Sequence, residues 1–213
     1  KLGMLHAWTP FTARNWNDAT WSLSVEALFY LFFPFAAGYF LKLKERALLP
    51  TALGLFALSS GVCAVRLMLM RQFEATGPHY LPAAQFAQDL ETVFARIPVL
   101  RLPEFLIGVA LGRLFLLRGR QMPSANAWFA ISGLAILLIL MSSRLIPDAF
   151  MECCALVIPM GLFVYSAAAI EGRLLRWLSW PGLILLGEAS YSLYLMHGPV
   201  AGLFRQAGQL ADH

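Results

Sequence analysis

The chain has 213 residues, of which 59% are hydrophobic and 13% charged; its mean hydropathy is +0.66 and its formal net charge is +4. Soluble domains have about 45–50% apolar and about 25% charged residues, so this composition excludes an ordinary soluble protein and indicates that the natural solvent is lipid. The three cysteines, Cys63, Cys153 and Cys154, lie in apolar runs without metal-ligand spacing, and we interpret them as buried thiols rather than as disulfides or a zinc site.

Six apolar segments are long enough to cross a bilayer as helices, which takes about 20 residues each. They cover residues 21–41, 47–70, 97–117, 127–145, 149–170 and 182–204. The longest joint between them, residues 71–96, has room for a short surface helix at about 82–94. The sequence therefore predicts an all-α fold, a polytopic membrane helix bundle with about six transmembrane helices.

Basic residues are concentrated in three short joints, those after the first, third and fifth segments. These residues are Lys42, Lys44, Arg46, Arg113, Arg118, Arg120, Arg173 and Arg176. The joints on the other side are longer or carry a net acidic charge. By the positive-inside rule, the basic joints are cytoplasmic, and residues 1–20 and the C-terminal tail lie outside.

The first segment carries a carboxylate close to its start. Ser22, Glu26 and Tyr30 are four residues apart and share one face of a helix, and Trp21 stands at its head, where tryptophan is common at membrane interfaces. An ionisable residue inside a membrane span is a functional hypothesis by default. Glu26 is predicted to accept a proton, to anchor a substrate hydroxyl, or to form a buried ion pair with an arginine of a neighbouring helix.

The stretch "RLPEFLIGVALGRL" (101–114) begins the third segment. Arg101 and Glu104 are three residues apart and can pair along one helix, and either is a candidate to share a polar pocket with Glu26. Gly108 and Gly112 form a small-residue face that lets another helix approach closely.

The stretch "LLGEASYSLYLMHGPV" (185–200) lies in the last segment. Tyr191, Tyr194 and His197 are three residues apart and form a polar aromatic stripe. His197 is either a structural hydrogen-bonding residue or a catalytic one. Gly198 and Pro199 directly after it predict a break in the helix, and such breaks in membranes face protein or a wet cavity.

The second and last segments each contain a further ionisable residue, Arg66 and Glu188. No glycine-rich phosphate loop, nucleophile elbow or metal-binding cluster is present in the sequence. The residues alone therefore leave an enzyme, a secondary transporter and a non-catalytic membrane scaffold open. A transporter of the usual kind would have corresponding interrupted helices in two repeats, and the sequence contains no such repeat.

Three stretches occur together and in order: "WSLSVEALFYLFFP" (21–34), "RLPEFLIGVALGRL" (101–114) and "LGEASYSLYLMHGPV" (186–200). Together they closely resemble the acyltransferase 3 family of integral membrane acyltransferases. The resemblance implies transfer of an acyl group, often acetyl from acetyl-CoA, to a hydroxyl of a carbohydrate such as a cell-surface polysaccharide. It implies acyl-CoA as donor substrate with no bound cofactor or metal, the lipid bilayer as surroundings, no nucleic-acid partner, and a bacterial inner membrane as location.

The resemblance also implies site residues. The family's catalytic histidine, on its first helix, and the arginine pair that follows have no counterpart here, because His6 does not match that motif. Residues 1–213 are therefore expected to be part of a single transmembrane domain, truncated at both ends and inactive alone. Glu26 corresponds to the acid of the first motif and is the predicted catalytic residue, although Ala27 replaces the second acid. The predicted substrate contacts are Trp21, Ser22, Tyr30, Arg101, Glu104, Tyr191, Tyr194 and His197.

Overall fold

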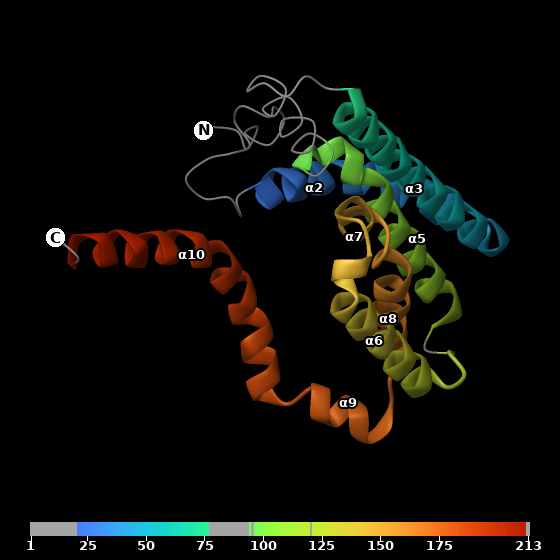
Figure 1. Ribbon diagram of the computed structural model, residues 1–213. Helices are drawn as coiled ribbons and strands as arrows, with labels where there is room; N and C mark the ends of the chain where they lie inside the picture. The colour runs from blue at the N-terminus through green and yellow to red at the C-terminus, as the bar shows by residue number, and fades with distance from the viewer. Residues whose placement is uncertain (1–20, 77–93, 95, 120, 212–213) are drawn as a thin grey trace.

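The computed structural model in Figure 1 describes residues 21–76, 94, 96–119 and 121–211, and every regular element in them is a helix. In chain order the elements are α2 (Trp21–Lys42), α3 (Glu45–Thr76), the 3-10 turn η3 (Pro98–Arg101), α5 (Leu102–Arg118), α6 (Ala125–Met141), the 3-10 turn η4 (Ser143–Leu145), α7 (Asp148–Cys153), α8 (Val157–Ala169), α9 (Gly172–Leu178) and α10 (Pro181–Ala211). The predicted all-α membrane helix bundle is confirmed. The surface helix expected at about 82–94 lies almost wholly outside the described residues.

Among the described residues, two helices are long and apolar enough to cross a membrane unaided, Trp21–Lys42 and the Glu45–Gln72 part of α3. A third candidate is the pair α8 and α9, bent by 105°, if the pair crosses as one broken span. The helices α5 and α6 have 17 residues each, which corresponds to about 26 Å of helix. They lie at the lower limit of what a bilayer core of about 30 Å requires. All six expected segments are thus helical, and two of them are full-length spans.

The core of the bundle lies between α2, α3 and α5. Its buried residues are Phe40, Leu48, Ala52, Ile107 and Ala110. The two alanines let the backbones of α3 and α5 approach, as small residues do where helices meet in lipid. Figure 1 shows α3 and α5 running alongside each other over much of their length.

A second group of helices, α6 with α8, packs on the other side of α5. The rings of Phe129 and Phe163 stack with centroids 4.4 Å apart. A Cβ added at Gly161 would lie 3.0 Å from Cδ1 of Leu111, so a larger residue there would displace the Leu111 side chain where α5 and α8 meet. Where the sequence predicted a close helix approach, at Gly108 and Gly112, an added Cβ would meet no described atom within 4 Å. That prediction was wrong for the described residues.

The expected single helix over 149–170 is instead two helices, α7 and α8, separated at Cys154–Leu156. Pro159 explains the break. In a continuous helix its ring would clash with the carbonyl of Ala155 and one hydrogen bond would be lost. Because α8 restarts at Val157, Pro159 falls in the first turn, where a missing N–H costs little.

The predicted helix break at Gly198–Pro199 is absent. The helix α10 continues from Pro181 to Ala211 with Pro199 inside it. Figure 1 shows that α10 bends partway along its length and stands apart from the other helices. A proline that removes one backbone hydrogen bond is an ordinary cause of such a bend.

The basic joints meet at one end of the bundle, as the charge pattern predicted. Arg118 donates to Glu45 over 2.7 Å, and Nη2 of Arg113 donates to the carbonyl of Leu41 at the end of α2 over 3.2 Å. The hydrogen bond and the charge attraction between Arg118 and the Glu45 carboxylate raise the pKa of the Arg118 guanidinium. Residues 121–126 and Ala169 and Glu171 line one further pocket at this end. The joints after α2, α5 and α8 therefore lie on the same side.

Replacing Ala110 by leucine is expected to overpack the interface between α3 and α5, where Ala110 is fully buried. Inserted methylene groups typically cost about 1–3 kcal/mol in a well-packed core. The thermal midpoint of the detergent-extracted protein should fall accordingly. Ala130→Leu, the same change at an exposed position of α6, is the control. Equal midpoints for the two variants would contradict the packing described.

Candidate functional site

Glu26 lies on α2, and the described side chain that contacts it comes from the far end of the chain. The hydroxyl of Tyr191, on α10, donates to Oε2 of Glu26 over 3.4 Å, which is a long hydrogen bond. Two residues that the sequence singled out separately are thus brought together. Among the described residues, the partner of the Glu26 carboxylate is a neutral hydroxyl rather than an arginine of a neighbouring helix.

The other predicted residues of α2 lie on either side of Glu26. Trp21 is the first residue of the helix and is half-buried, as is Ser22. Tyr30 is 76% exposed and points away from the packed core. Ser22 and Glu26 thus lie nearer the bundle than Tyr30, although the three share a predicted face.

The aromatic stripe of α10 also forms a local unit. The rings of Tyr194 and His197 lie 5.8 Å apart, and Nδ1 of His197 makes a short hydrogen bond with the backbone carbonyl of Tyr194. Because a carbonyl oxygen only accepts, this hydrogen bond requires the hydrogen to be on Nδ1. The imidazole is exposed and lies six residues after Tyr191 on α10.

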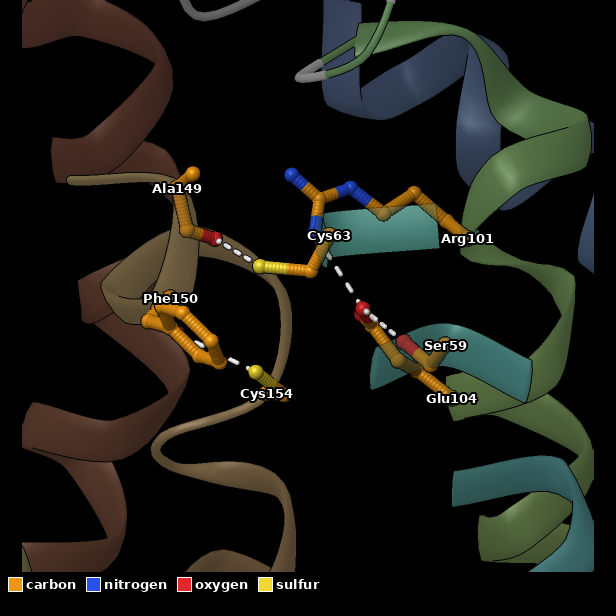
Figure 2. A network of polar contacts seen from close by, with 7 residues as sticks. All are labelled: Ser59, Cys63, Arg101, Glu104, Ala149, Phe150 and Cys154. Carbon is orange, nitrogen blue, oxygen red and sulfur yellow. Dashed lines mark hydrogen bonds and ion pairs between the residues drawn. The ribbon is translucent and has the colours of Figure 1, made fainter. Parts of the chain in front are cut away.

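Arg101 and Glu104 form the predicted ion pair, with Nη1 and Oε1 3.2 Å apart. The same carboxylate oxygen accepts a hydrogen bond of 3.4 Å from Ser59 of α3, a residue that the sequence reasoning missed. Figure 2 shows the Glu104 carboxylate between Arg101 and Ser59. The side chains are only 11% (Arg101) and 26% (Glu104) exposed, so the pair is largely screened from the surroundings.

Ser59 belongs to a polar face of α3 that also holds Cys63 and Arg66, all three buried. Their spacing of four and three residues is the signal that would have revealed this face in the sequence. The thiol of Cys63 donates to the carbonyl of Ala149 over 3.0 Å and so ties α3 to α7 (Figure 2). Cys63 and Cys154 are buried free thiols, as predicted, while the side chain of Cys153 is outside the described part.

Stacked rings join the Glu26 helix to the Glu104 helix. Phe29 of α2 lies flat on Phe105 of α5, with centroids 4.5 Å apart, and Phe33 meets the edge of Phe105 at 6.4 Å. Phe29 follows Glu26 by three residues and Phe105 follows Glu104 directly. The stacked rings therefore fix α2 to α5 close to the carboxylates of Glu26 and Glu104.

Below these rings, α2 and α5 enclose a groove of about 740 Å³, which we call the α2–α5 groove. It is lined by Phe33, Ala37, Phe40, Leu41, Glu104, Phe105, Gly108, Val109, Gly112, Arg113, Phe115 and Leu116. A second apolar pocket of about 410 Å³ lies between α5 and α8 and shares Glu104, Gly108, Gly112 and Phe115 with it. These volumes are in the range of small-molecule sites, about 300–1,000 Å³.

Chemically, the arrangement offers a carboxylate that accepts from a tyrosine hydroxyl, an exposed imidazole six residues further along α10, and an apolar groove that leads to a basic end. An ionised carboxylate only accepts hydrogen bonds, so Glu26 can hold an imidazole N–H or an alcohol in place. His6 lies outside the described residues.

The family model of an acyltransferase domain, acyltransferase 3, matches residues 2–212. No curated protein and no solved structure matches the chain.

Glu104→Ala should destabilise the protein by about 1–3 kcal/mol, because the buried Ser59 hydroxyl and Arg101 guanidinium lose a charged acceptor. Ser59→Ala should cost less, about 1 kcal/mol. Glu45→Ala breaks the half-exposed pair with Arg118 and serves as the control, with a smaller expected loss because solvent screens this pair. Thermal midpoints in detergent measure all three. A larger effect of Glu45→Ala than of Glu104→Ala would contradict the description of this cluster.

Proposed function

This chain belongs to the acyltransferase 3 family of membrane acyltransferases, and on that premise we propose that it acylates carbohydrate hydroxyls in a bacterial inner membrane. The donor is acyl-CoA, in the first place acetyl-CoA, and the acceptor is a cell-surface polysaccharide or its precursor. The observation that carries the proposed site is the contact of Glu26 with Tyr191, because it joins two of the family-like stretches at one carboxylate.

The basic end of the bundle supports acyl-CoA as the donor. Coenzyme A is an anion, and Lys42, Arg113 and Arg118 lie at the end that the positive-inside rule assigns to the cytoplasm, where acyl-CoA is available. Glu26 is near the other end of α2, one turn from its start. Donor and acceptor thus approach from opposite faces.

The proposed reaction is acyl transfer. The acceptor hydroxyl oxygen attacks the thioester carbon, a C–O bond forms, the C–S bond breaks, and the hydroxyl proton passes through a general base to the departing thiolate. A histidine is the base that the family resemblance implies. Glu26 is proposed to accept a hydrogen bond from that imidazole or from the acceptor alcohol, and so to fix its orientation.

The remaining predicted residues are assigned to substrate contact. Tyr191 is proposed to orient Glu26, and Tyr194 and His197, further along α10, are proposed to contact the acceptor. Trp21, Ser22 and Tyr30 line the neighbouring part of α2. Arg101 and Glu104 are proposed to shape the deeper end of the site through their ion pair.

Glu26→Gln in the full-length protein should lower acyl transfer about 100-fold or more, because an amide cannot replace a carboxylate in proton transfer or in raising the basicity of an imidazole. Release of radiolabelled acetyl from acetyl-CoA by isolated membranes measures this, at matched expression. Wild-type turnover by Glu26→Gln would remove this residue from the mechanism. No acetyl-CoA turnover by the wild-type protein would refute the proposed donor.

Tyr191→Phe removes only the hydroxyl that contacts Glu26, and we expect a loss of about tenfold in the same assay. Tyr39→Phe, the same change at an exposed tyrosine of α2, is the control and should keep wild-type activity. Equal activities of the two variants would show that the contact between α2 and α10 does not contribute to transfer.

A further inference from the structure

The helix α9 turns sharply away from α8. The two helices are bent by 105°, and the turn contains Gly172, whose φ of 73° is one that glycine adopts without strain. Figure 1 shows α9 linking α8 to α10 at one end of the structure. Glu171, directly before α9, lines a pocket there together with residues 121–126, so α9 belongs to the basic end of the bundle.

This short helix combines cations with large aromatic rings. Its sequence, GRLLRWL, contains Arg173, Arg176 and Trp177, and Trp180 follows the helix after two residues. Both arginines are exposed, and Trp177 and Trp180 are 64% and 62% exposed. Their spacing of three and four residues places Arg173, Arg176 and Trp177 on one side of the helix. This exposed face is therefore directed at the surroundings of the protein rather than at its core.

The position of this face relative to a bilayer follows from its chemistry. A guanidinium in the hydrocarbon core is costly, whereas tryptophan is enriched at the level of the headgroups. A helix with arginine and tryptophan side by side is typical of one that lies in the interface. Guanidinium groups bind phosphate through paired hydrogen bonds, and anionic lipids of the cytoplasmic leaflet attract basic segments. Charge complementarity therefore favours an anionic phospholipid as the partner of α9.

Other arginines at the basic end are already engaged within the protein. Arg118 donates to Glu45, and Arg113 donates to a backbone carbonyl at the end of α2. Among the described residues, no ion pair joins Arg173 or Arg176 to a carboxylate. The two positive charges of α9 thus face the surroundings uncompensated by the described part of the chain.

Trp180 joins α9 to α10. Its N–H donates to the carbonyl of Trp177 over 3.1 Å, and its own carbonyl accepts from the N–H groups of Leu183 and Ile184 over 2.9 and 3.1 Å. Its ring lies over the first turn of α10, where a Cβ added at Gly182 would be 2.5 Å from Cζ3 of the ring. The position of α9 therefore fixes where α10 begins.

We propose that α9 is an interfacial anchor that binds the phosphate groups of anionic phospholipids in the cytoplasmic leaflet. Arg173 and Arg176 hold the phosphates, and the rings of Trp177 and Trp180 lie among the headgroups. The anchor holds the start of α10, the helix whose Tyr191 contacts Glu26, at the membrane surface. This role differs from setting topology, because a basic residue that only orients the chain during insertion needs no particular lipid afterwards.

The experiment titrates the purified full-length protein, in a neutral detergent, with short-chain phosphatidylglycerol or with zwitterionic phosphatidylcholine. A lipid that binds the folded protein raises its thermal midpoint. Phosphatidylglycerol should act at a concentration about tenfold lower or more than phosphatidylcholine, and Arg173→Gln and Arg176→Gln should each raise that concentration about fivefold. Arg144→Gln, the same change at an exposed arginine between α6 and α7, is the control and should match the wild type.

A second measurement uses the wild-type protein in phosphatidylglycerol bilayers that contain an analogue of this lipid with a photoreactive group in its headgroup. Crosslinks should include residues 171–181, and they should be weaker there with a phosphatidylcholine analogue that carries the same group. This readout decides the matter if the arginine variants fail to accumulate in the membrane.

Equal effects of the two lipids, an equal loss in Arg144→Gln, or an absence of crosslinks in residues 171–181 would overturn the lipid anchor. Inorganic phosphate that raises the midpoint as much as phosphatidylglycerol would overturn it in favour of a site for a soluble anion. Acetyl-CoA that abolishes the effect of phosphatidylglycerol would overturn it in favour of a contact with the donor. Acyl transfer is not measured in either experiment, so failure of the anchor leaves the proposed function untouched.

Discussion

A carboxylate inside the apolar part of a membrane needs a polar partner, and this constraint organises the structure. Glu104 finds its partners in Arg101 and in Ser59 on another helix, and Glu26 finds a hydroxyl on α10. The contacts with Ser59 and Tyr191 join segments that are far apart in the chain. Because a lone charge in lipid costs much free energy, these polar contacts favour specific pairs of helices. The polar groups are accordingly concentrated on a few helix faces.

The helix α5 serves two purposes with two faces. Ile107 and Ala110 are buried against α3, and they hold the helix in place. Gly108 and Gly112 stand on the face that lines the apolar groove and its neighbouring pocket. Because Glu104 belongs to the same helix, the groove and the ion pair are fixed relative to each other. A site built on a packed helix holds its geometry better than one built on a loop.

Part of the fold could be predicted because helices are encoded locally. The apolar runs predicted α2 to within one residue, whereas α3 begins two residues before and ends six residues after the expected range 47–70. The prediction failed where a single residue outweighed composition. Pro159 divides an apolar run into α7 and α8, whereas Pro199 only accompanies a bend in α10. Composition alone does not distinguish these outcomes, because the neighbouring turns decide whether the lost hydrogen bond can be replaced.

The amino-acid sequence by itself determined that this protein is a helical membrane protein, that its basic joints share one side, and that Glu26, Arg101, Glu104 and Tyr191 are candidate site residues. These properties follow from hydropathy, charge placement and helical periodicity over short stretches. Only the tertiary structure decided that Tyr191 contacts Glu26 across 165 residues and that Ser59 completes the Glu104 cluster across 45. It also decided that the glycine face of α5 borders a groove rather than a described helix. Such pairings depend on how whole helices pack, and periodicity within one helix carries no information about which neighbour its polar face will meet.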